Sequence, residues 1–139
     1  MELAASVIAV ATLAGTTAKA FVRLRELHKG VPGRLCGLQR EVTDIEVVLR
    51  NVAAAIKERA DLPIPDRSTA DIPPLIERAE TSLEELKAIV EQVEADIQKN
   101  IPIARGYIWR KRQSELQGIQ GEIRSVKSSL NTLFGASTK

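Results

Sequence analysis

Few residues in this sequence could perform covalent chemistry or bind a metal ion. The chain contains one histidine, His28, and one cysteine, Cys36. A single cysteine excludes a disulfide within the chain, and one residue of each type is too few for a zinc site built from cysteine and histidine. A Ser-His-Asp or Cys-His arrangement for nucleophilic catalysis would have to use His28. These counts argue against an enzyme and predict neither a metal nor a cofactor.

The surroundings of each candidate in the sequence favour a structural role. His28 ends an apolar helical pattern, where we expect it to cap the helix or to be partly buried. Cys36 begins the next pattern, as a small buried hydrophobic residue would. The sequence GVPG at 30–33 lacks both the Lys-Ser/Thr ending and the preceding strand of a phosphate-binding loop. Glu84 and Glu85 resemble paired carboxylates, but they stand among other acidic residues on one helix face, which is typical of solvated surface.

The composition indicates one small domain with an aliphatic core. The 139 residues are 44% hydrophobic and 27% charged but only 3% aromatic, so leucine, isoleucine, valine and alanine must fill the core. The net charge of +2 is unevenly distributed: it is +4 over residues 1–40, −7 over 41–100 and +5 over 101–139. Basic ends that pack beside an acidic middle would neutralise one another within the domain, so this charge pattern does not require a nucleic-acid partner.

Four stretches repeat apolar residues in alternating steps of three and four, the spacing of an amphipathic helix. They cover residues 3–28, 35–56, 72–97 and 108–133, and segments with glycine or proline separate them at 30–33, 59–70 and 100–102. No β pattern of comparable length is present. The sequence therefore predicts an all-α protein, an antiparallel bundle of four main helices. We expect one domain over residues 1–134 and a flexible tail over 135–139.

The first stretch is unusual because residues 3–18 carry no charge and the expected helix is apolar on nearly all sides. Such a helix is either buried on most sides or in contact with lipid. Sixteen uncharged residues are fewer than the roughly 20 that span a bilayer, but extension through residue 24 reaches that length and includes two basic residues. A signal peptide is the other interpretation, although the acidic Glu2 stands where a basic segment is expected.

Aromatic and basic residues alternate in a second unusual segment, which opens the fourth stretch and comprises Arg105, Tyr107, Trp109, Arg110, Lys111 and Arg112. One interpretation is structural: Trp109 packs near the connection at 59–70, and the cations face the acidic third helix. A second is a membrane interface, where Trp and Tyr lie at headgroup depth and cations meet anionic lipid. A third is contact with a nucleic-acid backbone.

Two parts of the sequence resemble fungal HeLo-like domains, which include the N-terminal domains of fungal STAND, or NOD-like, receptors. The opening MELAASVIAVATLAGTTAKAFVRLREL resembles the start of these domains, where an apolar first helix runs into an end rich in Lys, Arg and Glu. In the last helix, YIWRK at 107–111 followed by VKSSLN at 126–131 resembles the aromatic-basic segment of the family and its Lys-Ser-Ser-Leu helix. Together the two matches bracket residues 1–134.

The resemblance implies a helical bundle related to the HeLo domain. It is similar to the four-helix domain of the necroptosis executioner pseudokinase and to plant RPW8-type domains. Members act in programmed cell death, innate immunity and heterokaryon incompatibility. After activation and oligomerisation, the N-terminal helix is thought to leave the bundle and enter a membrane. We therefore expect a domain that is cytoplasmic at rest and moves to the plasma membrane on activation. Its expected partners are anionic lipids, further copies of itself and a NOD-like receptor in cis or in trans, with no nucleic acid.

The resemblance also assigns roles to individual residues. The membrane-insertion helix would present Leu3, Val7, Ile8, Val10, Leu13, Gly15, Phe21 and Leu24. Contacts with the membrane interface or lipid headgroups would come from Lys19, Arg23, Arg105, Tyr107, Trp109, Arg110 and Lys111. The alternative is a non-lytic signalling adaptor or oligomerisation domain of a NOD-like receptor, in which the apolar first helix is only core.

Overall fold

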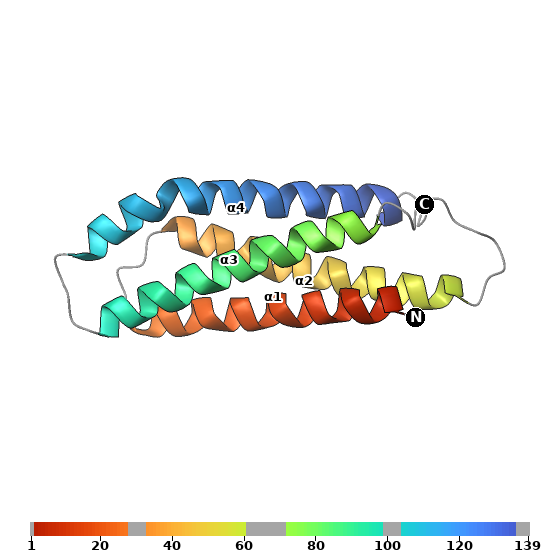
Figure 1. The fold of residues 1–139 in the computed structure, drawn as a ribbon, viewed down its shortest axis with the longest axis horizontal. Helices are drawn as coiled ribbons and strands as arrows, with labels where there is room; N and C mark the ends of the chain where they lie inside the picture. The colour runs from red at the N-terminus through yellow and green to blue at the C-terminus, as the bar shows by residue number, and fades with distance from the viewer. Residues whose placement is uncertain (1, 28–32, 61–71, 99–103, 136–139) are drawn as a thin grey trace.

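Each of the four apolar patterns forms an α-helix in the computed structural model of the chain (Figure 1). The structure describes residues 2–27, 33–60, 72–98 and 104–135, with side chains described within 3–26, 37–58, 72–95 and 113–133. The helices are α1 (Glu2–Leu27), α2 (Gly33–Ala60), α3 (Ile72–Gln98) and α4 (Ala104–Gly135). Successive helices run in opposite directions, which confirms the predicted all-α antiparallel bundle.

The helices occupy four corners in an order that differs from their order in the sequence. α1 packs against α2 and α3, and α4 packs against the same two helices, so α1 and α4 lie at opposite corners. In Figure 1, α4 runs along the top, α1 along the bottom, α3 in front and α2 behind. α1 and α3 are therefore parallel neighbours. α2 and α3 lie at the other two opposite corners, and residues 59 and 60, expected in the connection between them, belong to α2.

The core is aliphatic, as the composition predicts. Phe21 is the one aromatic residue in the part of the chain with described side chains, and it is fully buried. The predicted apolar positions of α2, α3 and α4 are buried wherever their side chains are described, except Leu116 and Leu133, which are partly buried. In α1 the predicted pattern of alternating steps is Leu3, Val7, Val10, Ala14, Thr17, Phe21 and Leu24, but the buried side also includes Ala4, Ala11 and Ala20, and Leu3 is only partly buried.

Helix boundaries follow the proline and glycine signals with one exception. Pro73 and Pro74 lie in the first turn of α3, where a missing N–H leaves no helical hydrogen bond unmade, and Gly135 is the last residue of α4. Gly33, expected in a loop, is instead the first residue of α2. The role predicted for His28 falls outside the described residues.

Two glycines within α4 reduce helix stability without serving the packing of the bundle. A Cβ atom added at Gly118 or Gly121 would meet no atom within 4 Å. Gly118→Ala and Gly121→Ala are therefore each expected to raise the free energy of unfolding, by up to about 1 kcal/mol, because alanine is the better helix former. Urea denaturation followed by circular dichroism measures this gain. A loss of stability in either variant would contradict the open surroundings of these glycines.

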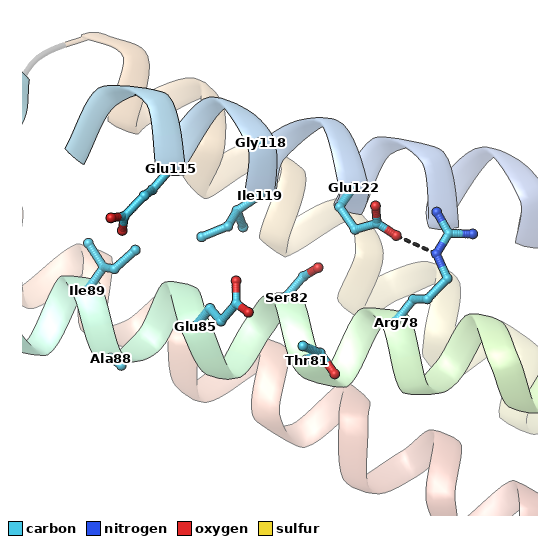
Figure 2. A pocket seen from close by; sticks show the side chains of 10 residues that line it. All are labelled: Arg78, Thr81, Ser82, Glu85, Ala88, Ile89, Glu115, Gly118, Ile119 and Glu122. Carbon is cyan, nitrogen blue, oxygen red and sulfur yellow. Dashed lines mark hydrogen bonds and ion pairs between the residues drawn. The ribbon is translucent and has the colours of Figure 1, made fainter. Parts of the chain in front are cut away.

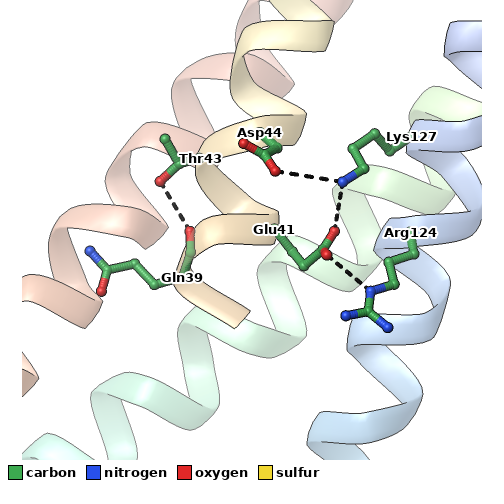
Figure 3. Close-up of polar contacts among 6 residues, drawn as sticks. All are labelled: Gln39, Glu41, Thr43, Asp44, Arg124 and Lys127. Carbon is green, nitrogen blue, oxygen red and sulfur yellow. Dashed lines mark hydrogen bonds and ion pairs between the residues drawn. The ribbon is translucent and has the colours of Figure 1, made fainter. Parts of the chain in front are cut away.

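Ion pairs join acidic residues of α2 to basic residues of α4 (Figure 3). The Glu41 carboxylate accepts a hydrogen bond from Arg124 Nε and another from Lys127 Nζ, each at 2.9 Å, and Lys127 Nζ lies 3.6 Å from Asp44 Oδ2. Partial burial acts to raise the pKa of Glu41, but the hydrogen bonds and charges of Lys127 and Arg124 outweigh it and hold the pKa below its usual value. At these residues the predicted neutralisation between the acidic middle and a basic end is confirmed.

Glu41→Gln is expected to lower the free energy of unfolding at neutral pH by about 1–2 kcal/mol, because two charge-assisted hydrogen bonds lose their carboxylate. Folding lowers the pKa of Glu41 from its ordinary 4.5, so its contribution is complete above that pH. The contribution is then lost as the pH falls through the lower pKa of the folded state. Urea denaturation at neutral pH and at about pH 3 should therefore show a gap between wild type and variant that narrows in acid.

Glu80→Gln is the matched control, because Glu80 is exposed on α3 and has no hydrogen bond or ion pair with any described residue. It should leave stability within about 0.5 kcal/mol of wild type at neutral pH. An equal loss from both variants, or a gap for Glu41→Gln that widens in acid, would contradict the role given to the Glu41 cluster.

Candidate functional site

α1 is the one helix, among the residues the structure describes, that is long and apolar enough to cross a membrane by length and composition. The qualifying stretch is Leu3–Glu26, and 39% of its most apolar window is buried inside the bundle. Core helices of soluble proteins and signal sequences meet the same criteria, so length and composition alone are weak evidence. The packing and polar contacts of α1 must be weighed with them.

The residues predicted to meet lipid hold α1 in the bundle. Val7, Val10, Phe21 and Leu24 are fully buried or nearly so, and Leu3, Ile8 and Leu13 pack partly against the same core. Gly15 faces α2, where a Cβ atom on it would come within 2.9 Å of Glu46 Oε2. These side chains can therefore reach lipid only if α1 leaves its neighbours.

The opposite side of α1 is exposed and carries small residues: Ala5, Ser6, Ala9, Thr12 and Thr16. α1 is thus a corner helix, and the sequence-based option of burial on most sides is wrong for this bundle. The reason is that only α2 and α3 cover α1, while α4 lies diagonally across the core. The exposed side has no charge as far as residue 18.

The threonine hydroxyls of α1 are satisfied within the helix itself. Thr12 Oγ1 donates to the carbonyl of Ile8 at 2.9 Å, and Thr16 Oγ1 donates to that of Thr12 at 3.0 Å. The buried Thr17 Oγ1 donates to the carbonyl of Leu13 at 2.8 Å. Because these bonds are internal, separation of α1 from the bundle breaks none of them. Inside a bilayer these three hydroxyls would also remain paired, which matters because an unpaired hydroxyl is costly in lipid.

The ion pairs and hydrogen bonds between described side chains of α1 and those of its neighbours lie in its last two turns. Arg23 Nε is 3.9 Å from Glu94 Oε2 of α3, and Arg25 Nη1 donates to Gln39 Oε1 of α2 at 3.1 Å. Both arginines are exposed, as is Lys19, so these contacts are worth little individually. From residue 3 to residue 18, apolar packing is what holds α1 in place.

The remaining headgroup candidates, Arg105, Tyr107, Trp109, Arg110 and Lys111, lie in the first turns of α4, and their side chains are outside the described ranges. The start of α4 and the end of α1 are at the same end of the bundle, so the structure brings this segment to the end that carries Lys19 and Arg23 (Figure 1). The end of α2 and the start of α3 lie at the other end. The interpretation that Trp109 packs near the 59–70 connection falls outside the described residues, because neither the Trp109 side chain nor residues 61–70 are described.

Residues suited to covalent or metal chemistry are not brought together in the described part of the chain. Cys36 lies in the first turn of α2 with its side chain outside the described ranges, and His28 is outside them entirely. Within those ranges, no group of three or more His, Cys, Asp or Glu residues is placed to hold a metal ion.

Sequence reasoning missed a groove of about 770 Å³ between α3 and α4 (Figure 2). Ile89 and Ile119 give it apolar walls, and Glu85, Glu115 and Glu122 lie along its length. The one signal in the sequence is Gly118, which lines the groove and is an unfavourable residue within a helix.

In comparisons with known proteins, the chain matches no protein-family model, no curated protein and no solved structure. Membership of the HeLo-like family therefore stays a prediction. The fold, the properties of α1 and the groove are the findings on which a functional proposal rests.

Proposed function

We propose that this chain is a membrane-targeting, cell-death-inducing domain of the HeLo-like type. In this proposal, activation and self-association release α1, which inserts into the anionic plasma membrane and permeabilises it, in signalling linked to a NOD-like receptor. The observation that carries the proposal is the combination of properties in α1. The helix has a spanning length, its threonine hydroxyls are satisfied internally, and its ion-pair and hydrogen-bond contacts with other described side chains are confined to its last two turns.

The energetics suit a helix with two alternative environments. Release exposes the buried side of α1 and the surfaces of α2 and α3 that it covered, at about 25 cal/mol per Å² of apolar area. Insertion offsets part of this cost, because Val7, Phe21 and Leu24 move from one apolar environment to another. The backbone needs no new partners, because its hydrogen bonds lie within the helix. Lys19 and Arg23 lie near the C-terminal end of the apolar stretch, where their cations can reach headgroups.

Vesicle flotation and dye release test the proposal on the intact chain, clustered through a fused domain that dimerises on addition of a small molecule. We expect the clustered chain to float with vesicles that contain phosphatidylserine and to release their dye. Vesicles of phosphatidylcholine alone should bind less, because the basic end of α1 then meets no anionic lipid. A clustered chain that leaves both kinds of vesicle intact and unbound would contradict the proposal.

The alternative, a non-lytic adaptor, has one observation in its favour: the groove between α3 and α4 is an open surface away from α1. An adaptor would signal through such a surface while α1 stays in the core. Cell killing that is unchanged by a charge placed in the exposed middle of α1 would favour the adaptor.

A further inference from the structure

The groove between α3 and α4 combines an apolar interior with acidic margins. Ile89 on α3 and Ile119 on α4 face it, and both are more than nine-tenths buried. Figure 2 shows Glu85 and Glu115 beside them and, further along, the ion pair between Arg78 and Glu122. The groove runs between two long helices, and its occupation does not depend on the release of α1.

A buried hydroxyl that is unpaired among the described residues points into this groove. Ser82 is 6% exposed and lines the groove, and Figure 2 shows its hydroxyl directed from α3 toward α4. No described residue forms a hydrogen bond with it. Thr12, Thr17 and Thr43, by contrast, each donate to the carbonyl four residues earlier in their own helix. A buried polar group that lacks a partner lowers the stability of the folded state. A hydrogen bond from the Ser82 hydroxyl to an atom outside the bundle would remove this cost.

Small residues on both sides of the groove leave room for another backbone. Ala88 stands on α3 and Gly118 on α4, and a Cβ atom at residue 118 would meet no atom within 4 Å. The bundle itself does not need a glycine at this position, where it lowers helix stability. An incoming helix does benefit, because small residues allow two helices to approach closely.

The charge of the groove selects a cationic occupant. Three glutamates line it against the single Arg78, which is already paired with Glu122 and donates to Ser125 Oγ at 3.2 Å. Glu85 has no hydrogen bond or ion pair with any residue in the described part of the chain. The whole of α3 contributes to the same negative potential, since the helix carries seven acidic and two basic residues, Glu85 and Arg78 included.

We propose that this groove is a docking site for a basic amphipathic helix of a partner protein. The apolar side of that helix packs on Ile89 and Ile119, and its backbone passes close to Gly118. Lysine or arginine side chains pair with Glu85 and the neighbouring carboxylates, and a polar side chain of the partner bonds the Ser82 hydroxyl. This is recognition of an amphipathic helix by an apolar groove.

The probe for a test is a synthetic peptide of about five helical turns, roughly 18 residues, with leucine and alanine on one side and lysine on the other. A second peptide replaces every lysine by glutamate. Each is titrated into the full chain while backbone amide NMR signals are recorded. We expect the lysine peptide to shift the signals of Ser82, Ile89 and Ile119, and the glutamate peptide to leave them in place. Absence of these shifts with the lysine peptide overturns the proposal.

Gly118→Leu projects a bulky side chain into the groove where the partner backbone is proposed to pass, and should weaken binding of the lysine peptide at least about tenfold. Gly121→Leu is the matched control: it makes the same change one turn along α4, outside the lining of the groove, and should alter affinity less than about twofold. Circular dichroism confirms that both variants fold. Equal affinity of Gly118→Leu and wild type overturns the proposal. A second outcome also overturns the proposal: without peptide, the groove signals of wild type shift as the protein concentration rises, and those of Gly118→Leu do not. The occupant of the groove would then be a second copy of the chain.

Discussion

Phe21→Ala is expected to lower the free energy of unfolding by about 3–5 kcal/mol. Phe21 is fully buried and has the largest side chain of the described core. Its truncation leaves a cavity between α1 and its neighbours in addition to the lost transfer of the ring from water. A domain of this size has a total stability of roughly 5–15 kcal/mol, so the variant loses a large fraction of it.

Urea denaturation followed by circular dichroism measures this loss, with Val22→Ala as the control. Val22 is the next residue of α1 and is 42% exposed, so its truncation should change stability by less than about 0.5 kcal/mol. Similar small effects from the two variants would show that α1 does not pack through Phe21 in solution. The docked resting state from which α1 is proposed to leave would then be refuted.

Thr12→Lys is expected to weaken insertion of the clustered chain into vesicles by roughly 100-fold. Thr12 is near the middle of the apolar stretch, and a lysine at the centre of a membrane-spanning helix costs about 2.5–3.5 kcal/mol. In the resting bundle Thr12 is exposed, so the substitution removes only an exposed hydroxyl hydrogen bond and should leave the fold intact. Flotation with phosphatidylserine vesicles over a range of lipid concentrations measures the change.

Val47→Lys provides the control for this experiment. Val47 is 54% exposed on α2, so the substitution adds the same charge to the resting surface without changing α1. The added lysine is attracted to anionic lipid in both variants, which by itself would increase binding. A loss of flotation in Thr12→Lys would therefore have to come from the position of the charge within α1. Undiminished flotation of Thr12→Lys would show that residue 12 does not enter the bilayer, and the adaptor function would then be favoured.

The helices could be predicted because their signals are local. In α2 and α3 most positions of the apolar pattern have a polar neighbour along the chain, so the pattern identifies the buried side and the structure confirms it. In α1 nearly every residue is apolar or small, and the pattern does not define which side is buried. Ala4 and Ala11 face the core, and Leu3 does so only in part, because the surfaces of α2 and α3 decide the orientation.

The arrangement of the helices depends on contacts between residues far apart in the sequence. The charge totals predicted that a basic end would neutralise the acidic middle, but they did not identify Lys127 as the partner of Glu41, 86 residues away. The spacing of apolar residues in steps of three and four also does not indicate which helices lie at opposite corners of the bundle. For the same reason the groove beside Gly118 could not be predicted from the sequence.

The central claim, that α1 must separate from the bundle to enter a membrane, is tested most directly by a cross-link. In a Cys36→Ser background, Arg23→Cys and Glu94→Cys place thiols on α1 and α3 where the Arg23–Glu94 pair now stands, and a short bismaleimide joins them. The control joins α3 to α4 through Arg78→Cys and Glu122→Cys and leaves α1 free.

Each variant is clustered and floated with phosphatidylserine vesicles before and after cross-linking. The account predicts that cross-linking α1 to α3 abolishes flotation, whereas cross-linking α3 to α4 does not. Equal flotation of the two cross-linked proteins would contradict it.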